Sequence, residues 1–143
     1  MNARDLEDIL RKVFGLPSFR PFQESVCRDV VAGHDALLVM PTGAGKSLCY
    51  QLPGFLRRGP TLVVSPLIAL MEDQVAKLKG MGLAADRIHS GRGRDLGWEV
   101  KNRYLAGEIQ FLFVAPERLG VPGVPEWLLQ RPPALVAVDE AHC

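Results

Sequence analysis

The sequence has 143 residues, a length that fits one domain and excludes a machine of two domains. Its 17 Lys and Arg residues nearly balance its 16 Asp and Glu residues, so any contact with a polyanion must come from a local patch rather than from net charge. Hydrophobic residues make up 48% of the chain and charged residues 23%, which is typical of a globular protein with one core.

The first part of the chain predicts two helices. The apolar residues of the first helix recur at helical spacing: Leu6, Ile9, Leu10 and Val13. The second helix is expected from about Pro21 to Val31, with Phe22, Val26 and Val30 on one stripe, and Gly33 ends it.

Short apolar runs then alternate with helical segments. The expected strands are residues 36–40, 61–65, 87–90, 111–115 and 134–138. The expected helices are a segment from Lys46 that Pro53 and Gly54 interrupt, a segment over 67–78 with Leu70, Met71, Val75 and Leu78 inward, and a segment through Leu96, Val100 and Tyr104. Proline-rich loops are expected around Trp127 and Leu128. All-apolar strands between helices indicate an α/β fold, in which helices cover both faces of a parallel sheet.

The cysteines and the N-terminus bear on location. Cys27, Cys49 and Cys143 are widely spaced and form no CxxC pair, so they predict reduced thiols rather than a zinc or redox site. The polar start of the chain does not fit a secretory signal, and no apolar run approaches the roughly 20 residues that span a membrane. The sequence therefore predicts no membrane contact and a cytoplasmic location, with access to a bacterial nucleoid or, in a eukaryote, a nuclear location.

The segment PTGAGKS follows the first expected strand and opens a helix. Its glycines allow successive backbone N–H groups to point at a phosphate, which the helix N-terminus also favours. Lys46 would reach the β and γ phosphates, and Ser47 would supply a hydroxyl to Mg²⁺. The residues expected to bind the nucleotide in this segment are Thr42, Gly43, Ala44, Gly45, Lys46 and Ser47. Met40 stands where the pattern has its first glycine, so a glycine-rich turn with an incidental lysine is the alternative.

The last expected strand ends in two adjacent acids. Asp139 would hold Mg²⁺ directly or through water, and Glu140 would polarise the attacking water. A solvated strand end is the alternative, but the phosphate loop upstream favours the catalytic interpretation. Because both loops follow the carboxyl ends of strands in one parallel sheet, they are expected to meet.

Five segments in order closely resemble the first half of the motor of RecQ-type DNA helicases, in superfamily 2: FGLPSFRPFQ, VMPTGAGKSLCYQLP, TLVVSPLIALMEDQV, FLFVAPERL and AVDEAHC. The resemblance runs from about Phe14 to the last residue. It implies a P-loop NTPase with a RecA-like sheet, and an ATP-dependent DNA helicase that moves 3′ to 5′ in DNA recombination and repair. The implied cofactors are ATP and Mg²⁺, and the implied partner is DNA, single-stranded and at duplex junctions.

The resemblance also assigns roles to residues. It implies that Arg20 and Gln23 hydrogen-bond the adenine, while Leu16 stands where an aromatic ring often stacks on the base. It makes Lys46 and Glu140 the catalytic residues. The segments 65–67 and 116–118 correspond to elements that touch the DNA backbone. Without the surrounding motifs, an ion-paired Arg20 and a solvated Gln23 would be the preferred interpretations.

The resemblance finally implies parts that this sequence lacks. They are an aromatic-rich DNA-sensing loop, a Ser-Ala-Thr strand between the two loop-bearing strands, and a second RecA-like domain with an arginine finger. Residues 1–143 are therefore expected to form a partial first RecA-like domain, incomplete at its C-terminus and inactive alone. The alternatives are a short product that binds nucleotide without catalysis, or another superfamily 2 motor such as an RNA helicase.

Overall fold

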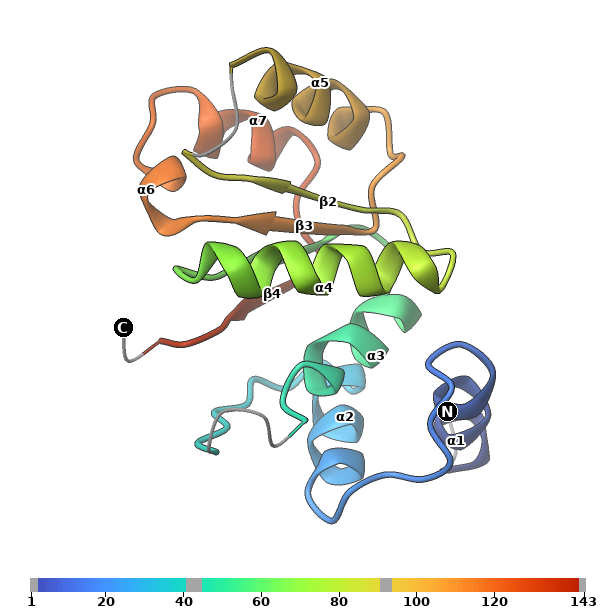
Figure 1. The fold of residues 1–143 in the computed structure, drawn as a ribbon. Helices are drawn as coiled ribbons and strands as arrows, with labels where there is room; N and C mark the ends of the chain where they lie inside the picture. Colours follow the sequence, from blue (N-terminus) through green and yellow to red (C-terminus); the bar gives the residue numbers. More distant parts are fainter. Residues whose placement is uncertain (1–2, 41–44, 91–93, 142–143) are drawn as a thin grey trace. The chain divides into compact units, whose positions relative to one another are not determined.

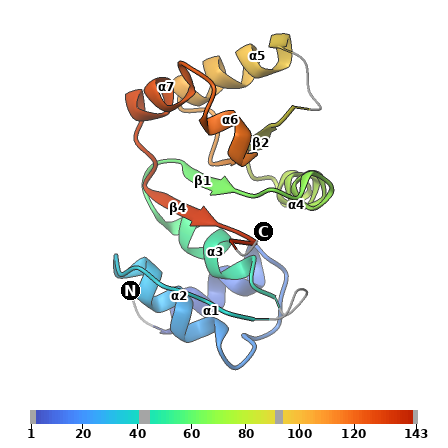
Figure 2. The ribbon, with the colours of Figure 1, turned by 90° about the vertical axis from the view of Figure 1, so that its left-hand side faces the viewer.

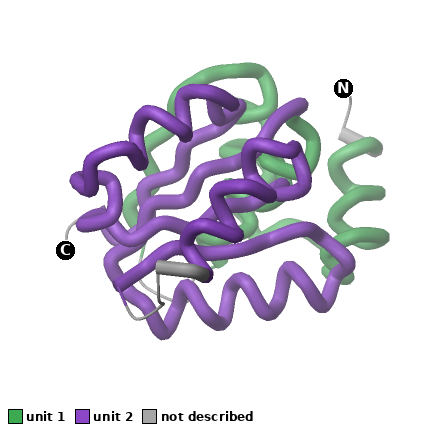
Figure 3. Tube along the Cα trace, turned by 90° about the horizontal axis from the view of Figure 1, so that it is seen from above, with its two compact units in different colours: residues 1–57 green, residues 58–143 purple. Residues whose placement is uncertain are grey.

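The computed structural model describes residues 3–40, 45–90 and 94–141. The elements follow the chain in this order (Figure 1): α1 (Ala3–Lys12), α2 (Gln23–Val31), α3 (Leu48–Leu56), β1 (Thr61–Val64), α4 (Ile68–Gly80), β2 (Ala85–Ile88), α5 (Arg94–Leu105), β3 (Phe111–Val114), α6 (Pro116–Leu119), α7 (Val124–Gln130) and β4 (Leu135–Val138). They form two compact units, residues 1–57 and 58–143, and each is described by itself (Figure 3). None of these helices is long and apolar enough to cross a membrane.

The first unit contains the helices α1, α2 and α3. Helix α2 buries Gln23, Cys27 and Val30, so the predicted stripe was wrong at Phe22 and Val26, which are only partly buried. The observed stripe is also helical in spacing, but it begins one residue later and includes a polar amide. A pattern of apolar residues alone does not identify such a stripe, because burial of the amide depends on hydrogen bonds to distant backbone.

The predicted strand over residues 36–40 is absent. These residues have no strand pairing, and Leu37 and Val39 are 89% and 83% exposed. A strand needs a neighbour for its backbone N–H and C=O groups, and no other described segment pairs with this run. Residues 36–40 are apolar, as a buried strand would be, but the prediction that they form a strand was wrong.

Helix α3 passes through Pro53 and Gly54, where the sequence predicted an interruption. A proline inside a helix removes a hydrogen bond and costs about 3 kcal/mol. Every residue from Leu48 to Gly54 is buried, and this packing offsets the cost.

The second unit is built on a four-stranded parallel sheet with the order β2-β3-β1-β4. Val64 of β1 is in register with Val114 of β3 and Val138 of β4. Along the sheet, the connection from β1 to β2, which contains α4, runs towards the β2 edge. The connections from β2 to β3 and from β3 to β4, which contain α5 and α7, run towards the β4 edge. Because such crossovers are right-handed, α4 lies on one face and α5 with α7 on the other, as Figure 2 shows for α4 and α7. The predicted α/β class with helices on both faces is confirmed.

One core lies between the sheet and helices α5 and α7. Its buried members are Leu62, Ile88, Val100, Tyr104, Ile109, Leu112, Val114, Val124, Trp127 and Leu128. The rings of Tyr104 and Trp127 meet edge to face with centroids 5.4 Å apart. Trp127 and Leu128 lie on helix α7 rather than in the predicted loop. Pro125 is compatible with this helix because it lies in the first turn, where its missing N–H has no partner to lose.

The remaining strands agree with the sequence prediction in kind. Strands β1, β3 and β4 fall inside the predicted runs, whereas β2 begins two residues before the predicted Arg87. Strand β4 lies at one edge of the described sheet, and its Val136 and Val138 are 55% and 61% exposed.

Candidate functional site

Gln23 connects the FRPFQ segment to the phosphate loop within the first unit. Its side-chain Nε2 donates to the Gly45 carbonyl at 2.9 Å, and its Oε1 accepts from the Arg20 backbone N–H at 2.8 Å. Both ends of the amide are therefore used, which is why a glutamine can be buried at 3% exposure. The structure thus brings together Arg20, Gln23 and Gly45, three of the predicted site residues.

Gly45 is held in a conformation that excludes a side chain. Its φ is +84°, in the left-handed region that favours glycine. A Cβ at this position would lie 2.6 Å from Gln23 Nε2 and 3.2 Å from Arg20 Nη1. The glycine is therefore required both by the backbone and by the close approach of two side chains.

Lys46 and Ser47 lie at the start of helix α3. The Lys46 carbonyl accepts from the Cys49 N–H at 2.9 Å, and the Ser47 carbonyl accepts from the Gln51 N–H at 2.9 Å. Ser47 occupies the N-cap position without a side-chain capping bond, so α3 does not use its hydroxyl. The positive N-terminal end of α3 thus begins directly after the lysine, as phosphate binding requires. The predicted Thr42, Gly43 and Ala44 lie outside the described residues.

Asp139 and Glu140 follow strand β4 in the second unit. The Asp139 N–H donates to the Val64 carbonyl at 2.9 Å, which continues the sheet hydrogen bonding by one residue. Asp139 Oδ1 accepts from the Glu140 N–H at 3.0 Å. Glu140 is buried and has a φ of +54°, which is uncommon for a residue with a side chain. Such backbone strain costs about 1–3 kcal/mol and is concentrated at functional sites.

The carboxyl ends of the four strands share one edge of the sheet. The residues that follow the strands there, in spatial order, are His89, Ala115, Ser65 and Asp139. Ser65 is buried, and its Oγ accepts from the Leu67 N–H at 3.4 Å. The segments 65–67 and 116–118, which the resemblance associated with DNA, therefore lie along the same edge as Asp139.

A charged network at this edge was not anticipated from the sequence. Glu72 Oε1 on α4 accepts from Arg87 Nε at 2.9 Å and lies 2.7 Å from His89 Nε2. The hydrogen bond from Arg87, and after it that from His89, hold the pKa of Glu72 below its usual range. On the other side, Asp86 pairs with Arg103 at 2.7 Å. The sequence does contain one indication of this network, because Asp86 and Arg87 are two adjacent charged residues inside a short strand. Their partners, however, are distant in sequence.

The predicted site residues are divided between the two units. Lys46 and Ser47 belong to the first unit, and Asp139 and Glu140 belong to the second. The approach of the phosphate loop to the two acids therefore stays a prediction.

Comparisons with known proteins identify the family of the chain. Residues 20–143 match the family model described as DEAD/DEAH box helicase. The chain is 42% identical to the ATP-dependent DNA helicase RecQ of Haemophilus influenzae, over 94% of the chain and 22% of that protein. It is 47% identical to the ATP-dependent DNA helicase Q4 of Homo sapiens, over 90% of the chain and 11% of that protein. The chain thus spans less than a quarter of the length of these relatives.

The fold is also found in solved structures. The crystal structure of the DUF1998 helicase MrfA bound to DNA superimposes with a TM-score of 0.69 and 21% identity, covering 90% of this chain and 19% of that one. This likeness supports the fold that the sequence resemblance implied.

Proposed function

The chain belongs to the DEAD/DEAH box helicase family, and on that premise we propose that it is the ATP-binding part of a RecQ-type DNA helicase. The whole protein would use ATP to move 3′ to 5′ on DNA in recombination and repair. Residues 1–143 would form part of its first RecA-like domain. In isolation, these residues would show no ATP hydrolysis that DNA stimulates. Its location would be the cytoplasm with access to the nucleoid, or the nucleus in a eukaryote.

The observation that carries the proposal is the hydrogen bond between Gln23 and the Gly45 carbonyl. It fixes the segment that would recognise adenine against the loop that would hold the phosphates. A helix face with a solvated glutamine would have no such link. The same contact supports Arg20 as a second adenine ligand, because its guanidinium lies beside Gly45.

The remaining roles follow the chemistry of each group. Lys46, at the N-terminus of α3, would neutralise charge on the β and γ phosphates, together with the backbone N–H groups of residues 42–47. Glu140 would accept the proton of the attacking water. Glu140, unlike Asp139, has a positive φ, and the two adjacent acids would perform separate tasks.

The donor set fits Mg²⁺. The Ser47 hydroxyl, which α3 leaves out of its cap, and the Asp139 carboxylate are hard oxygen donors. Mg²⁺ usually keeps several waters and binds through one or two protein oxygens and the substrate phosphates. When bound, Mg²⁺ would neutralise charge on the phosphates.

The test is DNA unwinding by the full-length protein and by its Glu140→Gln variant. We expect the variant to bind ATP normally and to unwind no DNA, because the amide cannot accept a proton from water. Fluorescence-detected unwinding of a duplex with a 3′ tail measures this, with ATP binding measured in parallel. Normal unwinding by the variant would overturn the role of Glu140, and stimulation by RNA but not by DNA would point to another nucleic-acid motor.

A further inference from the structure

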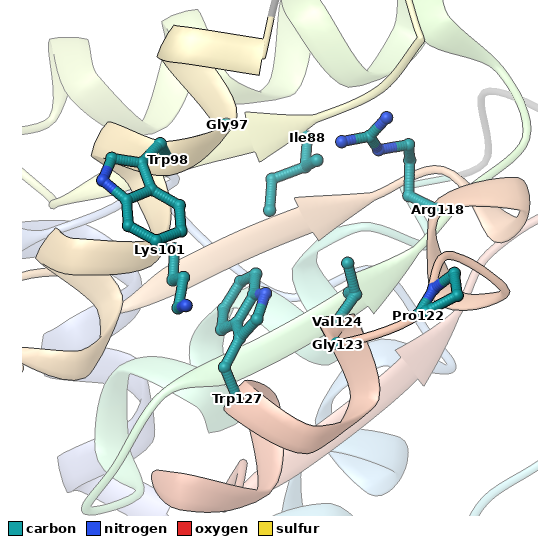
Figure 4. A pocket seen from close by; sticks show the side chains of 9 residues that line it. All are labelled: Ile88, Gly97, Trp98, Lys101, Arg118, Pro122, Gly123, Val124 and Trp127. Carbon is teal, nitrogen blue, oxygen red and sulfur yellow. The ribbon is translucent and has the colours of Figure 1, made fainter.

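A pocket lies in the second unit between α5, α7 and the end of β2, and its lining includes none of the residues assigned to ATP (Figure 4). We call it the α5–α7 pocket. Its volume is about 260 Å³. Ile88, Val124 and Trp127 form its apolar wall, and Trp98, Lys101 and Arg118 project from its rim. Its lining combines aromatic and cationic side chains, and the described residues that line it include no carboxylate.

Neither cation of the pocket pairs with an anionic group among the residues whose side chains the structure describes. Arg118 Nε is buried and makes no hydrogen bond, and its guanidinium pairs with no carboxylate among the side chains that the structure describes. The Lys101 ammonium lies 4.4 Å from the centre of the Trp98 ring, a cation–π contact that leaves its charge uncompensated. A buried hydrogen-bond donor without a partner is costly, so the pocket is suited to an anion.

The aromatic side chains specify the rest of the ligand. Trp98 is 63% exposed, an unusual position for the largest apolar ring, and Trp127 is almost fully buried in the wall. Bases stack on such rings regardless of sequence, whereas phosphates bind Arg and Lys. The volume lies just below the range of roughly 300 to 1,000 Å³ typical of sites for drug-sized ligands, which suits one base rather than a stack of bases.

We propose that the α5–α7 pocket binds one nucleotide unit, with the base against the two tryptophans and the phosphate at Arg118 and Lys101. The unit would come from a single strand of nucleic acid or from a free nucleotide. The choice of a nucleotide over another aromatic anion rests on the proposed function, since a nucleic-acid motor works among such units. The pocket shares no lining residue with those assigned to ATP, Mg²⁺ or the attacking water.

The chain offers a direct readout of this pocket. It contains two tryptophans, and both line the pocket. The intrinsic tryptophan fluorescence of the 143-residue chain therefore reports on occupancy of the pocket. The excitation wavelength is chosen longer than the wavelengths that thymine absorbs. The probes are a short oligothymidylate, an abasic oligomer of the same length and charge, and thymidine monophosphate. We expect the oligothymidylate to quench the fluorescence saturably and the abasic oligomer to quench it at least about tenfold more weakly, because stacking is lost.

Thymidine monophosphate separates the two sources of the ligand. Quenching by the mononucleotide at similar concentrations assigns the pocket to free nucleotides, and quenching by the oligomer alone assigns it to a strand. Equal quenching by the abasic oligomer, or stronger quenching by a peptide that ends in an aromatic residue and its carboxylate, would overturn the proposal.

Variants locate the binding. Arg118→Gln should weaken oligothymidylate binding about tenfold, Arg118→Lys should recover part of it, and Trp98→Ala should weaken it similarly. Because the Trp98 side chain is exposed, its removal should leave the fold intact, so weaker binding by Trp98→Ala would not be explained by unfolding. Lys79→Gln, on an exposed part of α4, is the matched control and should bind as the unchanged chain does. Wild-type affinity in both Arg118→Gln and Trp98→Ala would contradict the assignment.

This test is independent of the ATP site. ATP binding that depends on Lys46, combined with no quenching by any nucleotide probe, would refute the α5–α7 pocket alone. Quenching without ATP binding would refute the proposed function and leave a nucleotide pocket of another purpose.

Discussion

Gln23 is buried with both ends of its amide hydrogen bonded, and one of these bonds reaches the phosphate loop 22 residues away. The motif identified this residue, but its type alone suggested a solvated helix position. Burial of a polar side chain is decided by partners that a local pattern does not contain. At the residue scale, therefore, the sequence motifs predicted that Arg20, Gln23 and Gly45 lie close together. Only the structure showed the contact with Gln23 that explains why residue 45 is a glycine.

Gly45→Ala should disturb this contact. The new methyl group would lie 2.6 Å from Gln23 Nε2 in a backbone conformation that alanine adopts poorly. We expect a loss of ATP affinity of about tenfold or more, measured by titration with a fluorescent ATP analogue. Gly33→Ala is the control, because Gly33 also has a positive φ but open space around it. Equal losses of affinity in both variants would show that backbone strain, and not the contact with Gln23, is responsible.

Glu72 provides a prediction on pH. The pKa of Glu72 is lowered in the folded chain by Arg87 and then by His89, so the carboxylate stabilises the fold above its unfolded pKa of roughly 4.3. That contribution is lost as the pH falls through the lower folded value. Because the Glu72 side chain is 39% exposed, we expect Glu72→Gln to cost at most about 1 kcal/mol of unfolding free energy at neutral pH.

Urea unfolding at several pH values measures the Glu72 effect. The difference between Glu72→Gln and the unchanged chain should shrink towards zero in acid. Glu108→Gln serves as the control, because Glu108 is exposed and its side chain pairs with no described cation. A difference that stays constant from neutral to acidic pH would mean that Glu72 stabilises by packing rather than by its charge.

At the scale of elements, the sequence predicted the class of the fold well and some elements poorly. The runs at 61–65, 111–115 and 134–138 contain strands because neighbouring strands accept their hydrogen bonds. The run at 36–40 is equally apolar but has no pairing partner among the described residues. Helix α3 passes through Pro53 because its surroundings bury it. In each case tertiary contacts, which a local pattern does not contain, decided the outcome.

Two leucines test this distinction. Leu37 and Leu62 lie in similar apolar runs, but Leu37 is almost fully exposed and Leu62 is buried in the core of the second unit. Leu62→Ala should destabilise the chain by about 2–5 kcal/mol, and Leu37→Ala by less than about 0.5 kcal/mol. Chemical denaturation of the two variants measures both values. A large loss in Leu37→Ala would show that the run at 36–40 is packed after all.

At the scale of the whole molecule, the predicted site is divided between two units. The phosphate loop and its adenine-side contacts belong to residues 1–57, and the two acids belong to residues 58–143. We expect nucleotide binding to rest mainly on the first set and hydrolysis on the second. We therefore expect ATP binding by this chain to depend first on Lys46, the lysine of the phosphate loop.

The most direct measurement is calorimetric titration of the 143-residue chain with ATP and Mg²⁺, compared with Lys46→Ala. We predict that the unchanged chain binds ATP and that Lys46→Ala weakens binding by about tenfold or more, because a charge-assisted contact to the phosphates is lost. Lys79→Ala, an exposed lysine on α4, should bind as the unchanged chain does. Equal ATP binding by the unchanged chain and by Lys46→Ala would contradict the account.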